Sequence, residues 1–221
     1  MTTIKTYYRN RFSSTGLKSK NEMWKVLCSS FLQKYVKYND TVIDIGAGYC
    51  EFINNINCAK KIAIDLNPDT KKFANKEVEV VSCSALKIPQ KYKGSADVLF
   101  MSNFLEHLSS KQEVIDCLAN ANQLLKNVGR IILIQPNINL VKEKYWDFID
   151  HTVPLNKGSI EEALAITGFQ KGETVEKFLP YNTKINLPMP NILLKFYLTL
   201  PSIIRPFAGQ SFFMATKSKH G

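Results

Sequence analysis

The sequence lacks the cysteine patterns of a disulfide framework or a zinc site. Its five cysteines, an odd number, stand at positions 28, 50, 58, 83 and 117, and no two of them form a Cys-x-x-Cys pair. That spacing fits neither a set of paired disulfides nor a cysteine-rich metal centre. We therefore expect reduced thiols and no metal site.

Long apolar runs are also missing from the sequence. No stretch of 18 consecutive apolar residues occurs, whereas a helix that spans a bilayer needs about 20. The first 20 residues contain no apolar core of the length found in signal peptides. These absences predict a cytoplasmic protein.

Acidic residues are scarce at both ends of the 221-residue chain, which has a net charge of +10. Residues 1–40 contain eight Lys and Arg against two acids, and residues 180–221 contain five Lys and Arg and no acid. Residues 41–179 are nearly neutral, with sixteen basic and seventeen acidic residues. The basic ends are either solvated lysine-rich surfaces or surfaces that face an anionic substrate or an acidic partner.

Five short apolar runs, separated by helical patterns, predict a parallel sheet covered by helices on both faces. The predicted strands are residues 41–46, 61–65, 78–82, 96–102 and 129–136, and the predicted helices between them are residues 49–57, 68–76 and 111–126. An amphipathic helix over residues 22–38 precedes the first strand. The pattern and the length together predict a single domain of the α/β class.

The pattern changes after Gly168. Two further strands are predicted at residues 169–179 and 210–217, and five of the nine prolines fall in the insertion between them. The apolar stretch 192–200 inside this insertion is too short to cross a bilayer. We interpret it as part of a small cap whose apolar side chains are buried as core, with a membrane-surface or acyl-binding role as the less favoured alternative.

A glycine-rich turn follows the first strand directly. Gly46, Ala47 and Gly48 stand between that strand and the next helix, and glycines there permit a tight turn with backbone N–H groups exposed to an anion. Asp65 ends the second strand, 21 residues after Asp44. A carboxylate at that point can accept hydrogen bonds from both ribose hydroxyls of a nucleoside lying across the strand tips.

The residue at position 51 distinguishes between two cofactors. A dinucleotide site places a third small residue there, so that helix and strand can pack closely beneath a pyrophosphate. Glu51 is bulky and anionic, which argues against a nicotinamide oxidoreductase. S-adenosylmethionine carries an ammonium group that tolerates nearby acids, and Asp44 is well placed for it.

Five motifs occur in one order, and together they resemble those of class I S-adenosylmethionine-dependent methyltransferases over roughly residues 20–170. The matching segments are residues 44–48, 65–68, 84–89, 97–108 and 125–131. The resemblance implies a Rossmann-like, doubly wound seven-stranded sheet, mostly parallel with the last strand antiparallel. It also implies a helical lid over residues 1–40, a cofactor-binding core over 41–179, a cap over 180–209, and a last strand and tail over 210–221.

The same resemblance implies which residues bind S-adenosylmethionine, and hence the product S-adenosylhomocysteine. The implied cofactor-binding residues are Asp44, Gly46, Ala47, Gly48, Asp65, Leu66, Asn67, Ser84, Ala85, Ser102 and Asn103. Asp65 and its successors would meet the ribose, and Ser84 and Ala85 the adenine. Ser84 stands where the family often has aspartate. Ser102 and Asn103 follow the fourth strand, where ligands bind in open α/β sheets.

Two histidines are candidates for a base that takes a proton from the acceptor. His107 follows the fourth strand, and His151 ends an aromatic and acidic segment, residues 145–151, beyond the fifth strand. In that segment Tyr145, Trp146 and Asp150 are candidate substrate-binding residues, and Asp150 could orient His151. For each histidine a purely structural role is the alternative.

Residues 136–169 resemble, less specifically, a subgroup of methyltransferases from bacterial surface-polysaccharide pathways. In such enzymes the N-terminal segment folds over the cofactor, which would bring Tyr7 and Arg11 to the substrate, the arginine against a phosphate. The resemblance implies O-methylation of a small anionic acceptor: a sugar, a nucleotide-linked molecule, or a phosphorylated or phosphoramidate precursor of a surface polysaccharide.

Other functions remain open at this point. The basic ends would suit an RNA methyltransferase, but Ser-Asn-Phe-Leu replaces the base-methylation motif after the fourth strand, so no nucleic-acid partner is expected. A lipid or quinone methyltransferase would use residues 192–200 near a membrane. A cofactor-binding protein without catalysis is a further alternative, since neither histidine is established as a base.

Overall fold

The computed structural model describes residues 14–181 and 191–218. Tyr7, Arg11, residues 1–13 of the predicted lid (1–40) and residues 182–190 of the predicted cap (180–209) lie outside these residues. The helices are α2 (Ser14–Ser30), α3 (Glu51–Asn55), α4 (Thr70–Phe73), α5 (Lys111–Leu124), α6 (Ile138–Val141), α7 (Lys157–Ile166) and α8 (Asn191–Thr199). Short 3-10 turns are η1 (Leu32–Tyr35), η2 (Gln90–Tyr92), η3 (Leu105–His107), η4 (Lys142–Asp147) and η5 (Ser202–Ile204).

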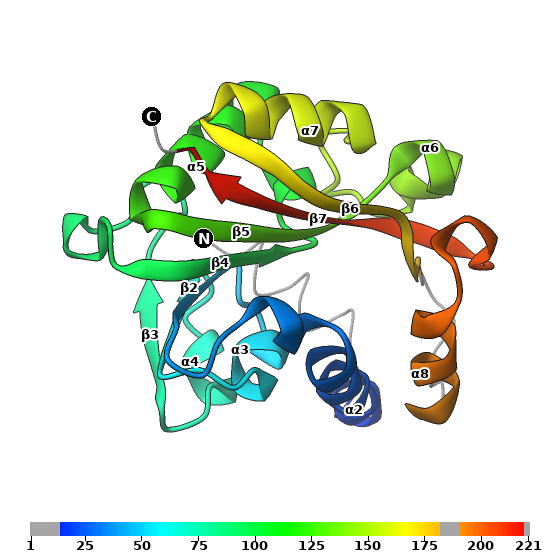
Figure 1. The fold of residues 1–221 in the computed structure, drawn as a ribbon, viewed down its shortest axis with the longest axis horizontal. Helices are drawn as coiled ribbons and strands as arrows, with labels where there is room; N and C mark the ends of the chain where they lie inside the picture. Colours follow the sequence, from blue (N-terminus) through cyan, green and yellow to red (C-terminus); the bar gives the residue numbers. More distant parts are fainter. Residues whose placement is uncertain (1–13, 182–190, 219–221) are drawn as a thin grey trace.

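One seven-stranded sheet organises the molecule (Figure 1). Its strands are β1 (Thr41–Ile45), β2 (Lys60–Asp65), β3 (Val78–Ser82), β4 (Ala96–Ser102), β5 (Leu125–Pro136), β6 (Phe169–Pro180) and β7 (Ala208–Lys217), in the order β3-β2-β1-β4-β5-β7-β6. β7 runs antiparallel to both β5 and β6, and the other pairs are parallel. The predicted α/β Rossmann-like fold is confirmed.

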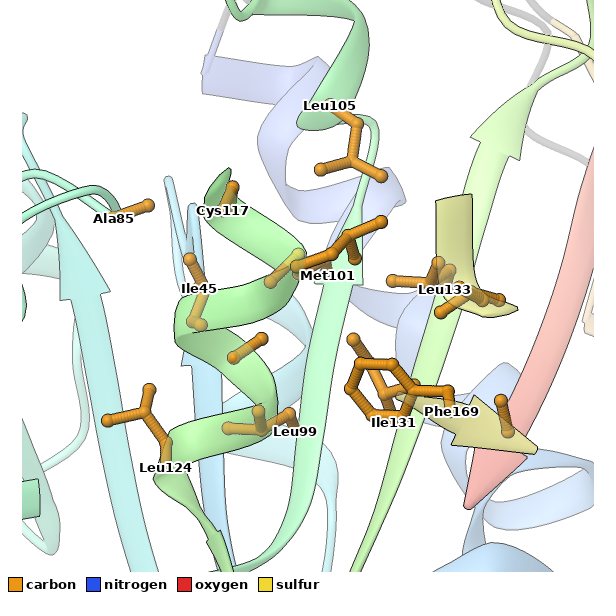
Figure 2. Close-up of a cluster of buried hydrophobic side chains, with 14 of the residues drawn as sticks. Ile45, Ala85, Leu99, Met101, Leu105, Cys117, Leu124, Ile131, Leu133 and Phe169 are labelled. Carbon is orange, nitrogen blue, oxygen red and sulfur yellow. The ribbon is translucent and has the colours of Figure 1, made fainter. Parts of the chain in front are cut away.

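The central strands are apolar along nearly their whole length because both faces of the sheet are covered. On one face Leu99, Met101 and Leu133 pack against α5 and α7 (Figure 2). On the other face Trp24 and Phe52 pack against Phe100, and the rings of Phe52 and Phe100 stack with centroids 3.6 Å apart. The fold thus has a hydrophobic core on each side of the sheet.

The N-terminal helix differs from its predicted range of residues 22–38. The observed helix α2 begins at Ser14 and ends at Ser30, and the 3-10 turn η1 follows it. Between them, the ring of Phe31 lies 4.7 Å from that of Phe178 and 5.0 Å from that of Phe212. The chain turns at Phe31 to bring its ring against β6 and β7, and this distant contact outweighs the local periodicity.

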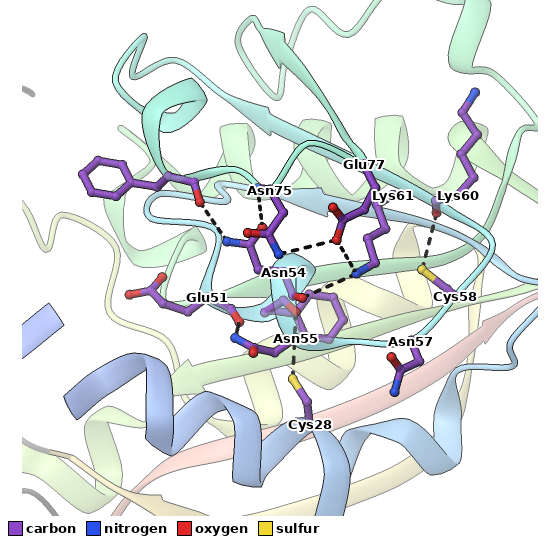
Figure 3. Close-up of polar contacts among 12 residues, drawn as sticks. Cys28, Glu51, Asn54, Asn55, Asn57, Cys58, Lys60, Lys61, Asn75 and Glu77 are labelled. Atoms are coloured by element: carbon purple, nitrogen blue, oxygen red, sulfur yellow. Dashed lines mark hydrogen bonds and ion pairs between the residues drawn. The ribbon is translucent and has the colours of Figure 1, made fainter. Parts of the chain in front are cut away.

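Polar contacts connect the short helix α3 to strand β2 and to the end of helix α4 (Figure 3). The Asn54 side chain donates to the Phe73 carbonyl at 2.8 Å and accepts from the Asn75 N–H at 2.9 Å. Lys61 reaches both the Asn54 carbonyl at 3.4 Å and the Glu77 carboxylate at 3.5 Å. Helices α3 and α4 are shorter than predicted because these loop contacts replace helical turns at their ends.

Strand β5 begins at Leu125, four residues before its predicted start. Leu125 pairs with Ala96, and a register shift separates this pair from the pairing of Val98 with Arg130. Val128 has a positive φ of 58° inside the irregular segment. Residues 125–128, which precede the predicted strand, therefore belong to β5.

The insertion before β7 is only partly buried, so the prediction that its apolar stretch is core is half wrong. Leu194 and Tyr197 of α8 are buried against the rest of the molecule, whereas Ile192, Leu193 and Phe196 are exposed. Helix α8 contacts α2 rather than the edge of the sheet alone. Among the described residues, no helix is long and apolar enough to cross a membrane.

Candidate functional site

The turn after β1 is the part of the candidate cofactor site where a side chain, the Phe104 ring, closely approaches the backbone. Gly46 donates its N–H to the Ile64 carbonyl at 2.8 Å, and Gly46 and Gly48 have φ values of 72° and 51°. A Cβ at position 46 would lie 2.4 Å from a ring carbon of Phe104. Glycine is required there for both the left-handed backbone and the close approach of the Phe104 ring.

Asp65 fastens this turn to the tip of β2. Its two carboxylate oxygens accept from the N–H groups of Gly48 and Asn67, each at 2.7 Å, and the side chain is buried. Burial raises the pKa of Asp65, although both hydrogen bonds act in the opposite direction. The carboxylate retains further lone pairs, so it can hold the turn and still accept a ligand hydroxyl.

Three carboxylates converge beneath the turn. Burial raises the pKa of Asp44 well above its usual range, and the negative charges of Glu51 and Asp65 raise it further. Lys20 of α2 is 2.9 Å from Glu51 and compensates part of this charge. A cationic ligand would relieve the remaining repulsion. The cationic sulfonium and ammonium groups of S-adenosylmethionine therefore fit this cluster of carboxylates, whereas an anionic pyrophosphate does not.

The other predicted cofactor-binding residues follow the tips of neighbouring strands. Ser84 accepts from the Leu86 N–H at 3.2 Å, and Ala85 is buried at the end of the sheet where β4 finishes (Figure 2). Asn103 has a φ of 48° and accepts from the Gln210 amide at 2.8 Å. Leu66 is 58% exposed, so beside Asp65 it presents an apolar surface on which a base could pack.

Ala47, Asn67 and Ser102 complete the predicted set. Ala47 and Asn67 are buried in the two loops, and Ser102 ends β4 next to Asn103, which donates to its hydroxyl at 3.3 Å. The structure therefore brings together all the predicted cofactor-binding residues on the carboxyl edge of the sheet, where open α/β sheets bind their ligands.

The two candidate bases lie side by side. The rings of His107 and His151 have centroids 5.0 Å apart, and Phe148 stacks on His151 at 5.0 Å. Nδ1 of His107 is 3.1 Å from the Asp150 carbonyl oxygen and 3.3 Å from its carboxylate. Asp150 thus contacts His107, whereas the sequence suggested a role beside His151.

Glu106 is a buried acid that the sequence prediction missed. It is 1% exposed, and its carboxylate lies 3.8 Å from Nε2 of His107. In the orientation that satisfies both neighbours, the Gln135 amide donates to Glu106 Oε2 at 2.5 Å and accepts from Leu105. Burial lowers the pKa of His107, but Glu106 and Asp150 outweigh it, so the net pKa is raised. The sequence signal that could have identified Glu106 is an acidic residue within the largely apolar motif 97–108.

The aromatic segment before His151 has two different environments. Tyr145 is fully buried and donates its hydroxyl to the Val153 carbonyl at 2.6 Å, so this side chain packs inside the fold. Trp146 is 53% exposed and remains accessible to a substrate. The predicted substrate-binding pair is therefore divided between the interior and the surface.

The five cysteines are free thiols and are poor candidates for nucleophiles. Burial raises the pKa of Cys117 to about 12 and that of Cys58 to about 11. Thiols with such values are protonated near neutral pH and react slowly. The chemistry of the site therefore rests on carboxylates and imidazoles.

Comparison with known proteins identifies the centre of the chain. Residues 43–133 match the family model described as "Methyltransferase domain", and the match contains the glycine turn and the tip of β4. The match covers 91 of the 221 residues, so this central part of the chain is similar to methyltransferase domains.

Solved structures share the fold of this chain. A solved S-adenosylmethionine-dependent methyltransferase from Archaeoglobus fulgidus has a TM-score of 0.61 at 19% identity, over 89% of this chain and 94% of that one. A complex of a Haloferax volcanii methyltransferase activator with a methyltransferase gives a TM-score of 0.67 at 11% identity, over 93% and 95%. At these identities the likeness is one of fold.

A curated relative is an uncharacterised protein of Methanocaldococcus jannaschii. It is 28% identical over 141 residues, which are 63% of this chain and 54% of that protein. The matched part thus spans about half the length of this relative.

Proposed function

We propose that the protein transfers a methyl group from S-adenosylmethionine to a hydroxyl of a small anionic acceptor. The observation that carries this proposal is the position of Glu106, His107 and His151. Phe104, whose ring lies against Gly46, is two residues before Glu106. The 3-10 turn η3, which contains His107, therefore directly follows the residue that covers the cofactor turn.

The residues around the turn account for cofactor binding. Asp44 and Glu51 provide negative charge for the cationic methionine end, and Asp65 provides acceptors for the ribose hydroxyls. Leu66 and Ala85 provide the apolar surfaces beside them. S-adenosylmethionine supplies an activated methyl group on sulfur. The protein's main contribution is to align an acceptor oxygen behind that methyl, which can supply ~7–11 kcal/mol.

A hydroxyl acceptor must lose a proton as its oxygen gains the methyl group, while sulfur keeps the electrons of the broken carbon–sulfur bond. His107 is held by Asp150 and can take up this proton in its neutral form, an effect worth ~10²–10⁴-fold. The neighbouring carboxylates raise the pKa of His107 above its usual value of 6.5. The rate is therefore expected to increase with pH and to level off only above pH 6.5. His151 lies beside it and completes the acceptor side.

Charge favours an anionic acceptor. The two basic ends flank a nearly neutral core in the sequence, and positive potential raises the local concentration of anions. Within this class we favour a sugar, a nucleotide-linked molecule or a phosphorylated precursor of a surface polysaccharide. Trp146 offers an exposed aromatic face on the same side, which suits packing against a sugar ring.

The experiment is a transfer assay with S-adenosylmethionine labelled in its methyl group, on panels of nucleotide-linked sugars, sugar phosphates and RNA. The expected result is one class of small anionic molecule that gains the labelled methyl group, and variants His107→Ala and His151→Ala that bind S-adenosylhomocysteine normally but turn over slowly. Label found only in RNA, or full activity of both variants, would contradict the proposal.

A further inference from the structure

Glu106, His107 and His151 carry the atom types that bind metal ions, in addition to the role proposed for the two histidines as bases. A carboxylate oxygen of Glu106 and ring nitrogens of His107 and His151 all lie within 4.8 Å of one another. Two imidazoles and one carboxylate are a common donor set for divalent first-row transition ions. The set comes from two segments of the chain, residues 106–107 and residue 151.

Backbone hydrogen bonds join those two segments. Thr152 and Val153 donate their N–H groups to the Glu106 carbonyl oxygen at 2.9 and 3.2 Å. They hold His151 beside the 3-10 turn η3, which contains Glu106 and His107. The convergence of the three side chains is therefore fixed by the fold and does not depend on flexible surface residues.

Neighbouring groups orient two of the three side chains, His107 and Glu106, as metal sites require. Nδ1 of His107 faces the Asp150 carbonyl and carboxylate at 3.1 and 3.3 Å, which turns Nε2 toward Glu106. Gln135 donates to Oε2 of Glu106 and leaves Oε1 on the side of His107. Ligating histidines usually make this kind of second hydrogen bond to a carboxylate or carbonyl.

We infer that Glu106, His107 and His151 bind a divalent transition-metal ion. Ligands 2.0–2.2 Å from a tetrahedral ion are roughly 3.4 Å apart, so the three atoms, which lie within 4.8 Å of one another, need to approach by at most roughly 1.4 Å. Three protein ligands leave one position open, the arrangement of a catalytic site rather than a structural one. The sequence alone gave no sign of this site, because its ligands are up to 45 residues apart.

The inference rests on the proposed function and gives the group a second way to activate the acceptor. A hydroxyl oxygen in the open position would lose its proton more easily, because a bound cation lowers the pKa of its oxygen ligand. The proton would pass to solvent, the freed lone pair would form the bond to the methyl carbon, and the sulfur would keep the electrons of the broken carbon–sulfur bond. In that state the imidazoles are ligands and do not take up the proton.

The test is cobalt binding to the full chain after treatment with a chelator, with neither cofactor nor acceptor present. We expect one Co²⁺ per chain by calorimetry, with visible absorption typical of low coordination number. The variants Glu106→Gln and His151→Ala are expected to bind it at least tenfold more weakly. Glu162→Gln removes an exposed carboxylate elsewhere and is expected to bind as the wild type does.

Two results would overturn the metal site: no Co²⁺ binding by the wild type, or unchanged binding in His151→Ala. Affinity for S-adenosylhomocysteine, measured on each variant, reports whether the domain is folded. Cobalt binding that persists in a protein without transferase activity would disprove the proposed function and leave the metal site intact.

A second, independent observation concerns the outer surface of the insertion. Six large apolar side chains there are between 50% and 89% exposed. They are Ile192, Leu193, Phe196, Ile203, Ile204 and Phe207, and together they are called the α8 patch. Such a concentration in sixteen residues is unusual on a protein surface and marks an interaction site.

The α8 patch is held outward by the buried side of the same segment. Leu194 and Tyr197 are buried beneath it, and Arg205 donates to the carbonyls of Phe178, Leu198 and Leu200. The exposed side chains therefore lie on an anchored element. Lys195 is exposed on α8 itself, and the exposed amine of Lys177 donates to the Ile203 carbonyl at 3.2 Å, so two lysines lie beside the patch.

We propose that the α8 patch docks the protein on the surface of an anionic lipid bilayer. Apolar side chains of an amphipathic helix enter the interface, and nearby lysines are attracted to acidic headgroups. The basic charge favours this occupant over a second copy of the same chain, because two copies would bring like charges together.

The test is co-sedimentation of the full chain with vesicles of phosphatidylcholine, with and without phosphatidylglycerol. We expect binding that is at least tenfold stronger with the anionic lipid, is weakened by salt, and is lost in the triple variant Phe196→Ser/Ile203→Ser/Phe207→Ser. Ile166→Ser, which changes an apolar residue that is 65% exposed on α7, serves as the control. Absent binding, or self-association that the triple variant abolishes, would overturn this proposal.

Discussion

Replacing Gly46 with alanine tests the cofactor turn directly. The added Cβ would lie 2.4 Å from one ring carbon of Phe104 and 2.8 Å from another, far inside the ~3.5–4.0 Å of normal carbon contacts. The φ of 72° at Gly46 adds ~1–2 kcal/mol for a residue with a side chain. The Phe104 ring must then move into the space next to the cofactor.

Calorimetric titration with S-adenosylhomocysteine measures the consequence. We expect Gly46→Ala to bind at least tenfold more weakly, which corresponds to about 1.4 kcal/mol. Gly94→Ala is the matched control, since Gly94 has a φ of 64° but a Cβ there meets nothing within 4 Å. It should lose stability by a similar backbone cost and keep its affinity.

A second substitution separates the two causes. Gly46→Ala combined with Phe104→Ala removes the ring that the new Cβ would meet, so part of the affinity should return while the backbone cost remains. Near-additive losses in the double variant would show that the two sites are not coupled. An unchanged dissociation constant in Gly46→Ala would refute the assignment of this turn to the cofactor.

Three further predictions follow from charge and burial. The pKa of Asp44 is raised in the folded protein, so its charge costs stability above pH ~4. Asp44→Asn should therefore raise the Tm increasingly as pH rises, while it weakens S-adenosylhomocysteine binding. A variant with the same Tm as the wild type at all pH values would contradict this. Asp65→Asn should weaken the same binding by ~1.5–3 kcal/mol, and unaltered calorimetric affinity would remove its role. Asp40 is buried and paired with Arg130, so Asp40→Ala should lower the unfolding free energy in urea by ~3–5 kcal/mol; a change within ±0.5 kcal/mol would disprove the importance of the pair.

The parts of the fold that depend on local sequence were predictable. Strand β1 and the turn that follows it are specified by an apolar run and by the glycines at positions 46 and 48, whose conformations are set within a few residues. Strands β1 to β4 therefore lie within one residue of their predicted bounds. Helix α2 was displaced because Phe31 packs on Phe178 and Phe212, and that contact is invisible in local periodicity.

The acceptor side was predictable only in part. His107 and His151 could be chosen as titratable residues after strands, but their proximity depends on hydrogen bonds from residues 152 and 153 to Glu106. The contact of Asp150 with His107 spans 43 positions of sequence. Pairings of this kind come from tertiary packing, so the ligand set around Glu106 emerged only from the structure.

The most direct measurement of the cofactor assignment is a pair of calorimetric titrations on the wild-type protein, one with S-adenosylhomocysteine and one with NAD. Saturable binding of a single S-adenosylhomocysteine per chain, abolished or strongly weakened by Gly46→Ala, is the predicted result, with no heat from NAD. Saturable binding of NAD, or S-adenosylhomocysteine affinity that does not depend on Gly46, would contradict it.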